Sequence, residues 1–203
     1  MGNHAIETEE YKGYNINIMY DENPENPRNW DNLSTMLCFH RGYSLGDIDQ
    51  KRENKYLITV KSKDFDNWNA VYDYLKKELK AVIILPLYLY DHSGISIKVG
   101  SYQGLLPQGH AEFDSGQVGF VYVTAEKLKA EGLTKKKGEE VIRAEVETYN
   151  NYLTGEVYGF SVVKNGENFD NCWGFYDIKD TIAEAKSNID YLAKEEKSLQ
   201  LQY

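Results

Sequence analysis

Cysteine is scarce in this chain, and that scarcity excludes a disulfide-stapled fold. The 203 residues include two cysteines, Cys38 and Cys172, with neither a CxxC pair nor the ligand spacing of a zinc finger. Both stand in apolar strings, MLCF and CWGF, which are typical of strand interiors. We therefore expect two buried free thiols that behave as small apolar side chains.

Long apolar runs are also missing. The longest, residues 81–90, is interrupted by Pro86 and is too short to cross a bilayer, which takes about 20 apolar residues. The opening string MGNHAI contains no apolar signal segment, and Ile6 stands where a myristoylation motif has Ser or Thr. The sequence thus predicts a cytoplasmic protein with no membrane contact.

Basic side chains are outnumbered. There are 23 Lys and Arg against 32 Asp and Glu, a net charge of −9. Residues 1–50 and 139–177 each carry a net charge of −6, whereas residues 51–138 carry +4. Since phosphate contacts need clustered Lys and Arg, this balance argues against direct nucleic-acid binding.

What is present is a series of strand and helix patterns. Alternating or continuous apolar residues predict strands at 14–20, 34–40, 55–61, 81–90, 95–99 and 116–124, and a hairpin of 156–163 with 168–176 around Asn165-Gly166. Apolar residues at steps of three and four predict helices over 64–80, 125–131 and 134–153, and a final helix that begins at Asp180.

This order predicts an α+β fold, with a mostly antiparallel sheet and helices packed on it. We expect residues 1–13 to form a flexible N-terminal segment because they are polar. Residues 14–203 are expected to form a single domain, with a possible seam near residues 131–137.

Several strings together resemble a known family. They are NPRNWDNL (26–33), CFHR (38–41), LGD (45–47), PLYLYDHSGI (86–95), DSGQVG (114–119), YLTGEVYG (152–159) and CWGFY (172–176). In them the chain resembles a family of uncharacterised proteins carried by bacteriophages and other mobile elements, over roughly residues 15–177. The resemblance implies a phage-like setting and action in the bacterial cytoplasm, and it carries over no catalytic role.

One candidate site is a set of histidines and carboxylates. Asp91, His92, His110 and Asp114 offer the nitrogen and oxygen ligands of a hydrolytic metal site, and His40, Asp47 and Asp49 are possible additions. However, adjacent strand residues point to opposite faces, so Asp91 and His92 cannot easily bind one ion unless the turn rotates one of them. The competing interpretation is that Asp91 caps a turn and His92 is a surface residue.

Ser115 stands in a glycine-containing string, DSGQVG, that superficially suggests a nucleophile or a phosphate loop. A nucleophile elbow needs Gly-x-Ser-x-Gly between a strand and a helix, and a phosphate loop needs a following Gly-Lys and helix. Neither frame is present, so we expect Ser115 to have no catalytic role.

Acidic and aromatic residues form the second candidate site, a partner-binding surface. Its expected members are Glu22, Glu25, Trp30, Glu139, Glu140, Glu145 and Glu147. Carboxylates spaced along a helix and its neighbouring loops can present charge as DNA phosphates do, and Trp is common at interface centres. An acidic exposed face that serves solubility alone is the competing interpretation.

Three functions follow from these features. The leading hypothesis is a phage-encoded binding protein without cofactor, not an enzyme, which inhibits a host defence protein such as a restriction or CRISPR nuclease. The alternative is a small metal-dependent hydrolase or nucleotide-binding protein that uses the histidine–carboxylate set with a divalent metal. A third possibility is a non-catalytic homodimeric module that associates through the final helix, residues 180–197.

Overall fold

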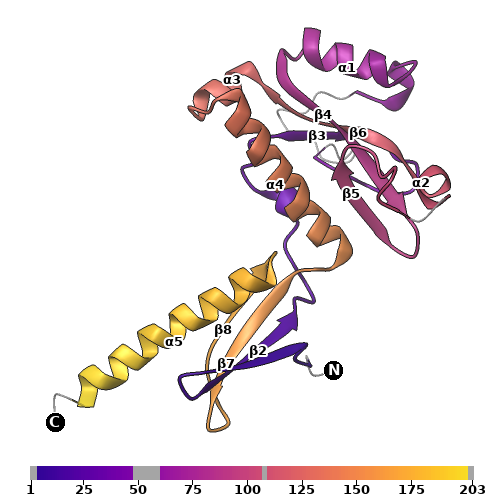
Figure 1. Ribbon diagram of the computed structural model, residues 1–203. Helices are drawn as coiled ribbons and strands as arrows, with labels where there is room; N and C mark the ends of the chain where they lie inside the picture. Colours follow the sequence, from indigo (N-terminus) through magenta and orange to yellow (C-terminus); the bar gives the residue numbers. More distant parts are fainter. Residues whose placement is uncertain (1–3, 48–59, 107–108, 201–203) are drawn as a thin grey trace. The chain divides into compact units, whose positions relative to one another are not determined.

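The chain folds as two compact units, each with its own antiparallel sheet (Figure 1). The computed structural model describes residues 4–47, 60–106 and 109–200. Unit 1 comprises Met1–Glu25 and Gly155–Tyr203, and unit 2 comprises Asn26–Thr154. The α+β prediction is confirmed, but the chain forms two units where the sequence predicted one domain.

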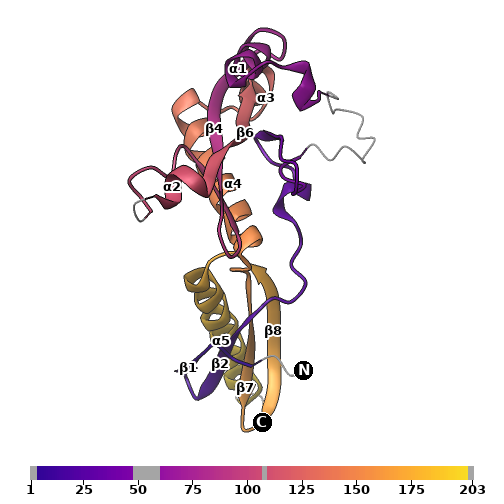
Figure 2. The same ribbon diagram turned by 90° about the vertical axis from the view of Figure 1, so that its right-hand side faces the viewer.

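Unit 1 is a four-stranded sheet with one helix on it. Its strands are β1 (Glu7–Tyr11), β2 (Tyr14–Tyr20), β7 (Tyr158–Lys164) and β8 (Glu167–Phe175), in the order β1-β2-β7-β8, and its helix is α5 (Ile178–Gln200). Figure 2 shows β2, β7 and β8 side by side with α5 along one face of the sheet. The N-terminal segment is therefore not frayed over Glu7–Tyr11, because this strand pairs with β2 from Glu7↔Ile18 to Tyr11↔Tyr14.

Two tight turns determine the register of β1 against β2 and of β7 against β8 in unit 1. Lys12 and Gly13 join β1 to β2 with φ of 51° and 77°, and Asn165 and Gly166 join β7 to β8 with φ of 53° and 84°. Positive φ at both central residues matches the right-handed twist of the paired strands. The predicted Asn-Gly hairpin is thus confirmed, with Lys164↔Glu167 as its closing pair.

The apolar stripe of the final helix packs inside unit 1. The core consists of residues from β2, β7 and α5: Tyr14, Ile16, Ile18, Phe160, Val162, Ala185 and Ile189. Ala185 and Ile189 are fully buried there, and Ile182 packs against the same core. A homodimer contact was predicted through this helix, residues 180–197; its apolar stripe packs within the chain itself.

Unit 2 has three layers: a helix, a sheet and a second helix. Its sheet has the order β3-β6-β4-β5, formed by β3 (Thr35–Cys38), β6 (Ser115–Thr124), β4 (Ala81–Asp91) and β5 (Ile95–Val99). The helices are α1 (Trp68–Lys77), α2 (His110–Phe113), α3 (Ala125–Ala130) and α4 (Lys135–Thr154), with short 3₁₀ turns η1 (Pro27–Asn29) and η2 (Ser62–Asp64). The expected seam at 131–137 lies within this unit, between α3 and α4.

Successive side chains of β6 point to opposite faces of the sheet, so unit 2 has an apolar core on each face. Val121 and Val123 pack with Ile142 and Val146 of α4, whereas Phe120 packs with Leu75 of α1 on the other face. Burial on both faces explains the nearly continuous apolar run of β4. The register of β4 against β6 shifts between Leu87 and Tyr88, next to Pro86, as a proline in a central strand requires.

Two sequence-predicted elements differ from the structure. The predicted helix 64–80 begins later, at Trp68, because Asn67 caps it by accepting a hydrogen bond from the backbone N–H of Ala70, while Asp64 belongs to η2. The predicted strand 55–61 lies mostly outside the described residues, and Val60 and Lys61 are not in a strand.

Gly119 gives a first testable prediction. A Cβ at this position would lie 2.0 Å from the backbone oxygen of Leu37 on β3, where β3 and β6 pair. Gly119→Ala is expected to lower the free energy of unfolding of unit 2 by about 1–3 kcal/mol through overpacking. Urea unfolding measures the effect, with Gly116→Ala on the same strand as the control, since its Cβ meets nothing within 4 Å. Equal effects of the two substitutions would contradict the packing argument.

Candidate functional site

Three of the four predicted metal ligands come together at one end of the unit 2 sheet. Strands β4 and β6 are paired up to Tyr90↔Ser115, and the Asp91 N–H donates to the Asp114 carbonyl at 2.8 Å. His92 follows β4 in a turn where Ser93 has a φ of 58° and Gly94 a φ of 147°. His110 opens α2, whose single turn places it four residues before Asp114. The sheet register and this turn therefore position the three side chains.

The ligand atoms of this His–His–Asp cluster are close to one another. Asp114 Oδ2 lies 3.2 Å from His92 Nδ1 and 3.3 Å from His110 Nδ1. The His92 and His110 rings meet edge to face with centroids 5.1 Å apart. Within the described ranges, this is the only group of three His, Cys, Asp or Glu side chains whose ligand atoms all lie within 4.8 Å of one another.

Asp91, the fourth predicted ligand, does not belong to the group. Its carboxylate accepts a hydrogen bond of 3.0 Å from the Tyr43 hydroxyl. This bond, with burial and the charge of Asp91 as smaller causes, raises the pKa of Tyr43. The turn thus separates Asp91 from His92, as expected for adjacent residues at a strand end.

The possible additions to the metal set also lie elsewhere. His40 Nδ1 accepts from the backbone N–H groups of Gly42 and Tyr43, and its ring stacks on Tyr43. Asp47 binds Arg28, and Asp49 lies outside the described residues. Ser115 donates to the Ala111 carbonyl, which ties it to α2 rather than to any histidine.

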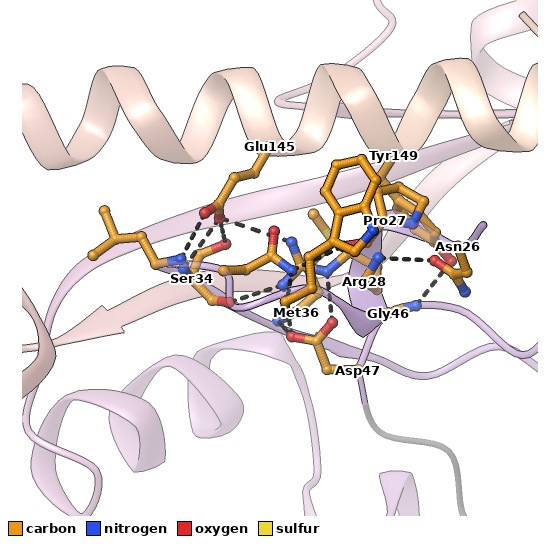
Figure 3. A network of polar contacts seen from close by, with 12 residues as sticks. Asn26, Pro27, Arg28, Ser34, Met36, Gly46, Asp47, Glu145 and Tyr149 are labelled. Atoms are coloured by element: carbon orange, nitrogen blue, oxygen red, sulfur yellow. Dashed lines mark hydrogen bonds and ion pairs between the residues drawn. The ribbon is translucent and has the colours of Figure 1, made fainter. Parts of the chain in front are cut away.

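A buried ion network crosses the core of unit 2, and sequence reasoning missed it (Figure 3). The Arg28 side chain is 2% exposed, and it donates to both Asp47 carboxylate oxygens at 2.6 and 2.7 Å and to the Ser34 carbonyl at 2.8 Å. Burial opposes the charged guanidinium, but the hydrogen bonds and charge of Asp47, with Glu145, raise the pKa of Arg28 overall. The only sequence signal was an arginine directly after two structure-breaking Asn-Pro pairs.

Glu145 belongs to this network and not to a partner-binding surface. Its carboxylate accepts from the backbone N–H of Leu33 at 2.6 Å and from the N–H and hydroxyl of Ser34, and it lies 3.7 Å from Arg28 Nη1. Figure 3 shows it pointing from α4 toward Ser34. Its predicted partner-binding role is wrong, because these contacts hold it inside unit 2.

The other carboxylates predicted on α4 are largely balanced by their neighbours. Glu139 pairs with Arg143 at 2.7 Å, and Glu140 pairs with Lys137 at 2.9 Å, while Glu147 is exposed. Unit 2 as a whole holds seventeen acidic and seventeen Lys or Arg residues, so its net charge is zero.

Unit 1 therefore carries the entire net charge of the protein. It holds fifteen acidic and six Lys or Arg residues, a net charge of −9. Glu22 and Glu25 are exposed in the segment after β2, and Glu7 is exposed on β1 opposite Ile18. None of these three makes an ion pair with another described residue. This charge comes from both segments of unit 1: residues 1–25 carry a net charge of −5 and residues 155–203 carry −4.

Exposed aromatic rings accompany this charge on unit 1. Phe169 and Trp173 on the edge strand β8 are 42% and 40% exposed, and Tyr191 on α5 is 62% exposed. Cys172, which lies between Phe169 and Trp173 on β8, is also exposed, so the expectation that both thiols are buried is wrong for this residue. Cys38 is buried as predicted. Trp30, predicted as a partner contact, is 44% exposed and belongs to unit 2.

Comparison with protein-family models, with curated proteins and with solved structures finds no match to this chain. Across the described residues, every helix is too short or too polar to cross a membrane.

Proposed function

We propose that the protein is a binding protein whose acidic unit 1 engages a basic surface on another protein. The observation that carries this proposal is the division of charge: −9 on unit 1 and zero on unit 2. A concentrated negative charge attracts a basic surface, speeds encounter and selects against acidic partners. A charge carried only for solubility would have no need to be confined to one unit.

The partner we propose is a host nucleic-acid enzyme of the restriction or CRISPR nuclease type. Such enzymes hold DNA in basic grooves, where closely spaced carboxylates replace phosphates. The resemblance to phage-borne proteins supports a host defence target, and exposed Phe169 and Trp173 supply apolar contact area on the same unit. On binding, unit 1 excludes DNA from the groove and inhibits the enzyme.

The test is capture from a bacterial lysate with the full chain as bait, followed by competition with DNA. The expected result is the capture of a nucleic-acid enzyme that binds either double-stranded DNA or this protein, but not both at once. Association should also slow as salt rises, because the Debye length falls to about 8 Å at 0.15 M. Binding that tolerates high salt and leaves DNA bound would contradict the proposal.

Two charge-matched variants locate the surface. Glu7→Gln, Glu22→Gln and Glu25→Gln together remove three charges from unit 1 and are expected to lower the association rate about tenfold. Glu139→Gln, Glu140→Gln and Glu147→Gln remove three charges from unit 2 and should leave the rate unchanged. Stopped-flow or surface-based kinetics distinguish them, and an equal loss in both variants would assign the effect to net charge alone.

A further inference from the structure

We propose that His92, His110 and Asp114 form a binding site for one divalent transition-metal ion, with zinc as the matching cation. The site belongs to unit 2, so it is independent of the proposed partner-binding role of unit 1. Two imidazole nitrogens and one carboxylate oxygen are a ligand set that zinc accepts, whereas calcium and magnesium prefer oxygen alone.

The spacing of the ligand atoms supports coordination to one ion. Two atoms that each lie about 2.0–2.1 Å from a tetrahedral zinc ion stand roughly 3.3 Å apart. Asp114 Oδ2 stands 3.2 Å from His92 Nδ1 and 3.3 Å from His110 Nδ1. Both histidines thus already present the same ring nitrogen to the same carboxylate oxygen, at the separation that a shared ion requires.

The polar environment of His110 also points to a missing ligand. Its Nδ1 is shielded from solvent, yet it makes no hydrogen bond within the described part of the chain, although Asp114 Oδ2 is 3.3 Å away. Buried polar atoms are satisfied in the great majority of cases, and an unsatisfied one calls for a specific explanation such as an ion. A metal bound at this nitrogen would satisfy it.

The backbone keeps the three ligands in place without the metal. The pairing of β4 with β6 and the bond from the Asp91 N–H to the Asp114 carbonyl connect the turn of His92 to Asp114. The α2 turn, closed by the Asp114 N–H donating to the His110 carbonyl, connects His110 to the same residue. The three side chains are 30% to 50% exposed, so an ion can approach the cluster from solvent even though His110 Nδ1 itself is shielded. Three protein ligands leave the fourth position of a zinc ion to water, as in catalytic zinc sites.

The test is direct metal binding by the full chain after removal of metals with a chelator. Titration calorimetry with zinc, and visible absorption with cobalt, should report one ion per chain bound through nitrogen and oxygen. Asp114→Asn is expected to weaken zinc binding by at least about tenfold, and His92→Ala with His110→Ala should abolish it. Zinc should also raise the melting temperature of the original protein but not that of the double variant.

Two control variants separate coordination from simple attraction of a cation. Asp91→Asn removes one negative charge next to His92 but leaves the three ligands in place, so zinc affinity should be retained. His4→Ala removes a histidine from unit 1 and should also have no effect. An affinity loss in Asp91→Asn as large as in Asp114→Asn, or no zinc binding at millimolar concentration by the folded protein, would overturn the proposal.

Discussion

Replacing Arg28 with alanine is expected to lower the free energy of unfolding of unit 2 by about 3–5 kcal/mol, since removing one partner of a buried ion pair leaves the other charge unpaired. Two carboxylates depend on this guanidinium: Asp47, held by two short hydrogen bonds, and Glu145, at 3.7 Å. Asp47 also accepts from the backbone N–H of Met36 on β3, and Glu145 from those of Leu33 and Ser34. The substitution therefore leaves both carboxylates without their cation, and it also weakens the contacts that hold the segment leading into β3.

Hydrogen exchange is the appropriate measurement because it reports unit 2 separately from unit 1. The opening free energy of the slowest-exchanging amides of β4 and β6 should fall by about 3–5 kcal/mol. Arg143→Ala is the matched control: it removes an arginine from the exposed face of α4, where the pair with Glu139 contributes about 0–1 kcal/mol. If both substitutions changed protection equally, the buried network would have no special role in stability.

Alkaline pH is expected to destabilise unit 2 through two buried acids. Burial raises the pKa of the Cys38 thiol from 9.0 to about 12, and the charge of Asp47 adds to the shift. Burial also raises the pKa of the Tyr149 hydroxyl from 10.0 to about 12, against the smaller opposing effect of the hydrogen bond from Gly46. Each group is held neutral in the folded state, so its contribution is fully present below its ordinary pKa and is lost as pH rises toward 12.

The magnitude follows from proton linkage. Each pH unit between the unfolded and folded pKa costs about 1.4 kcal/mol per group, so Cys38 alone accounts for about 4 kcal/mol over its range. Urea unfolding at pH values from about 8 to about 11 should show this slope. Cys38→Ala should flatten it above pH 9, whereas Cys172→Ala, which removes an exposed thiol, should not. An unchanged slope in Cys38→Ala would contradict the assignment.

Local patterns predicted most of the secondary structure but not the division into two units. The Asn165-Gly166 hairpin and the stripes of α4 and α5 depend on neighbouring residues, which a sequence displays directly. The pairing of β2 with β7, such as Asn15↔Val163, joins residues far apart in the chain, and no local pattern marks it. The Arg28 network could not be predicted for the same reason, because its members are far apart in the chain: they come from η1, the segment near Asp47 and α4.

The candidate site was predicted in part. The residue types identified Asp91, His92, His110 and Asp114, but only the β4–β6 register and the α2 turn select three of them. The role of Glu145 could not be inferred, because a carboxylate that bonds backbone N–H groups looks the same in sequence as one that faces solvent. The cysteines illustrate the same limit: Cys172 has apolar neighbours yet is exposed on an edge strand.

The chain enters unit 1, leaves after residue 25 to build all of unit 2, and returns at residue 155. During synthesis, β2 emerges from the ribosome long before its partner β7 exists. At about 5–20 residues per second, the delay is on the order of ten seconds, far longer than a small domain needs to fold. Unit 2 can therefore be complete while β1 and β2 still lack their partner strand. A nascent chain halted before residue 155 would contain one folded unit and two of the four strands of the other.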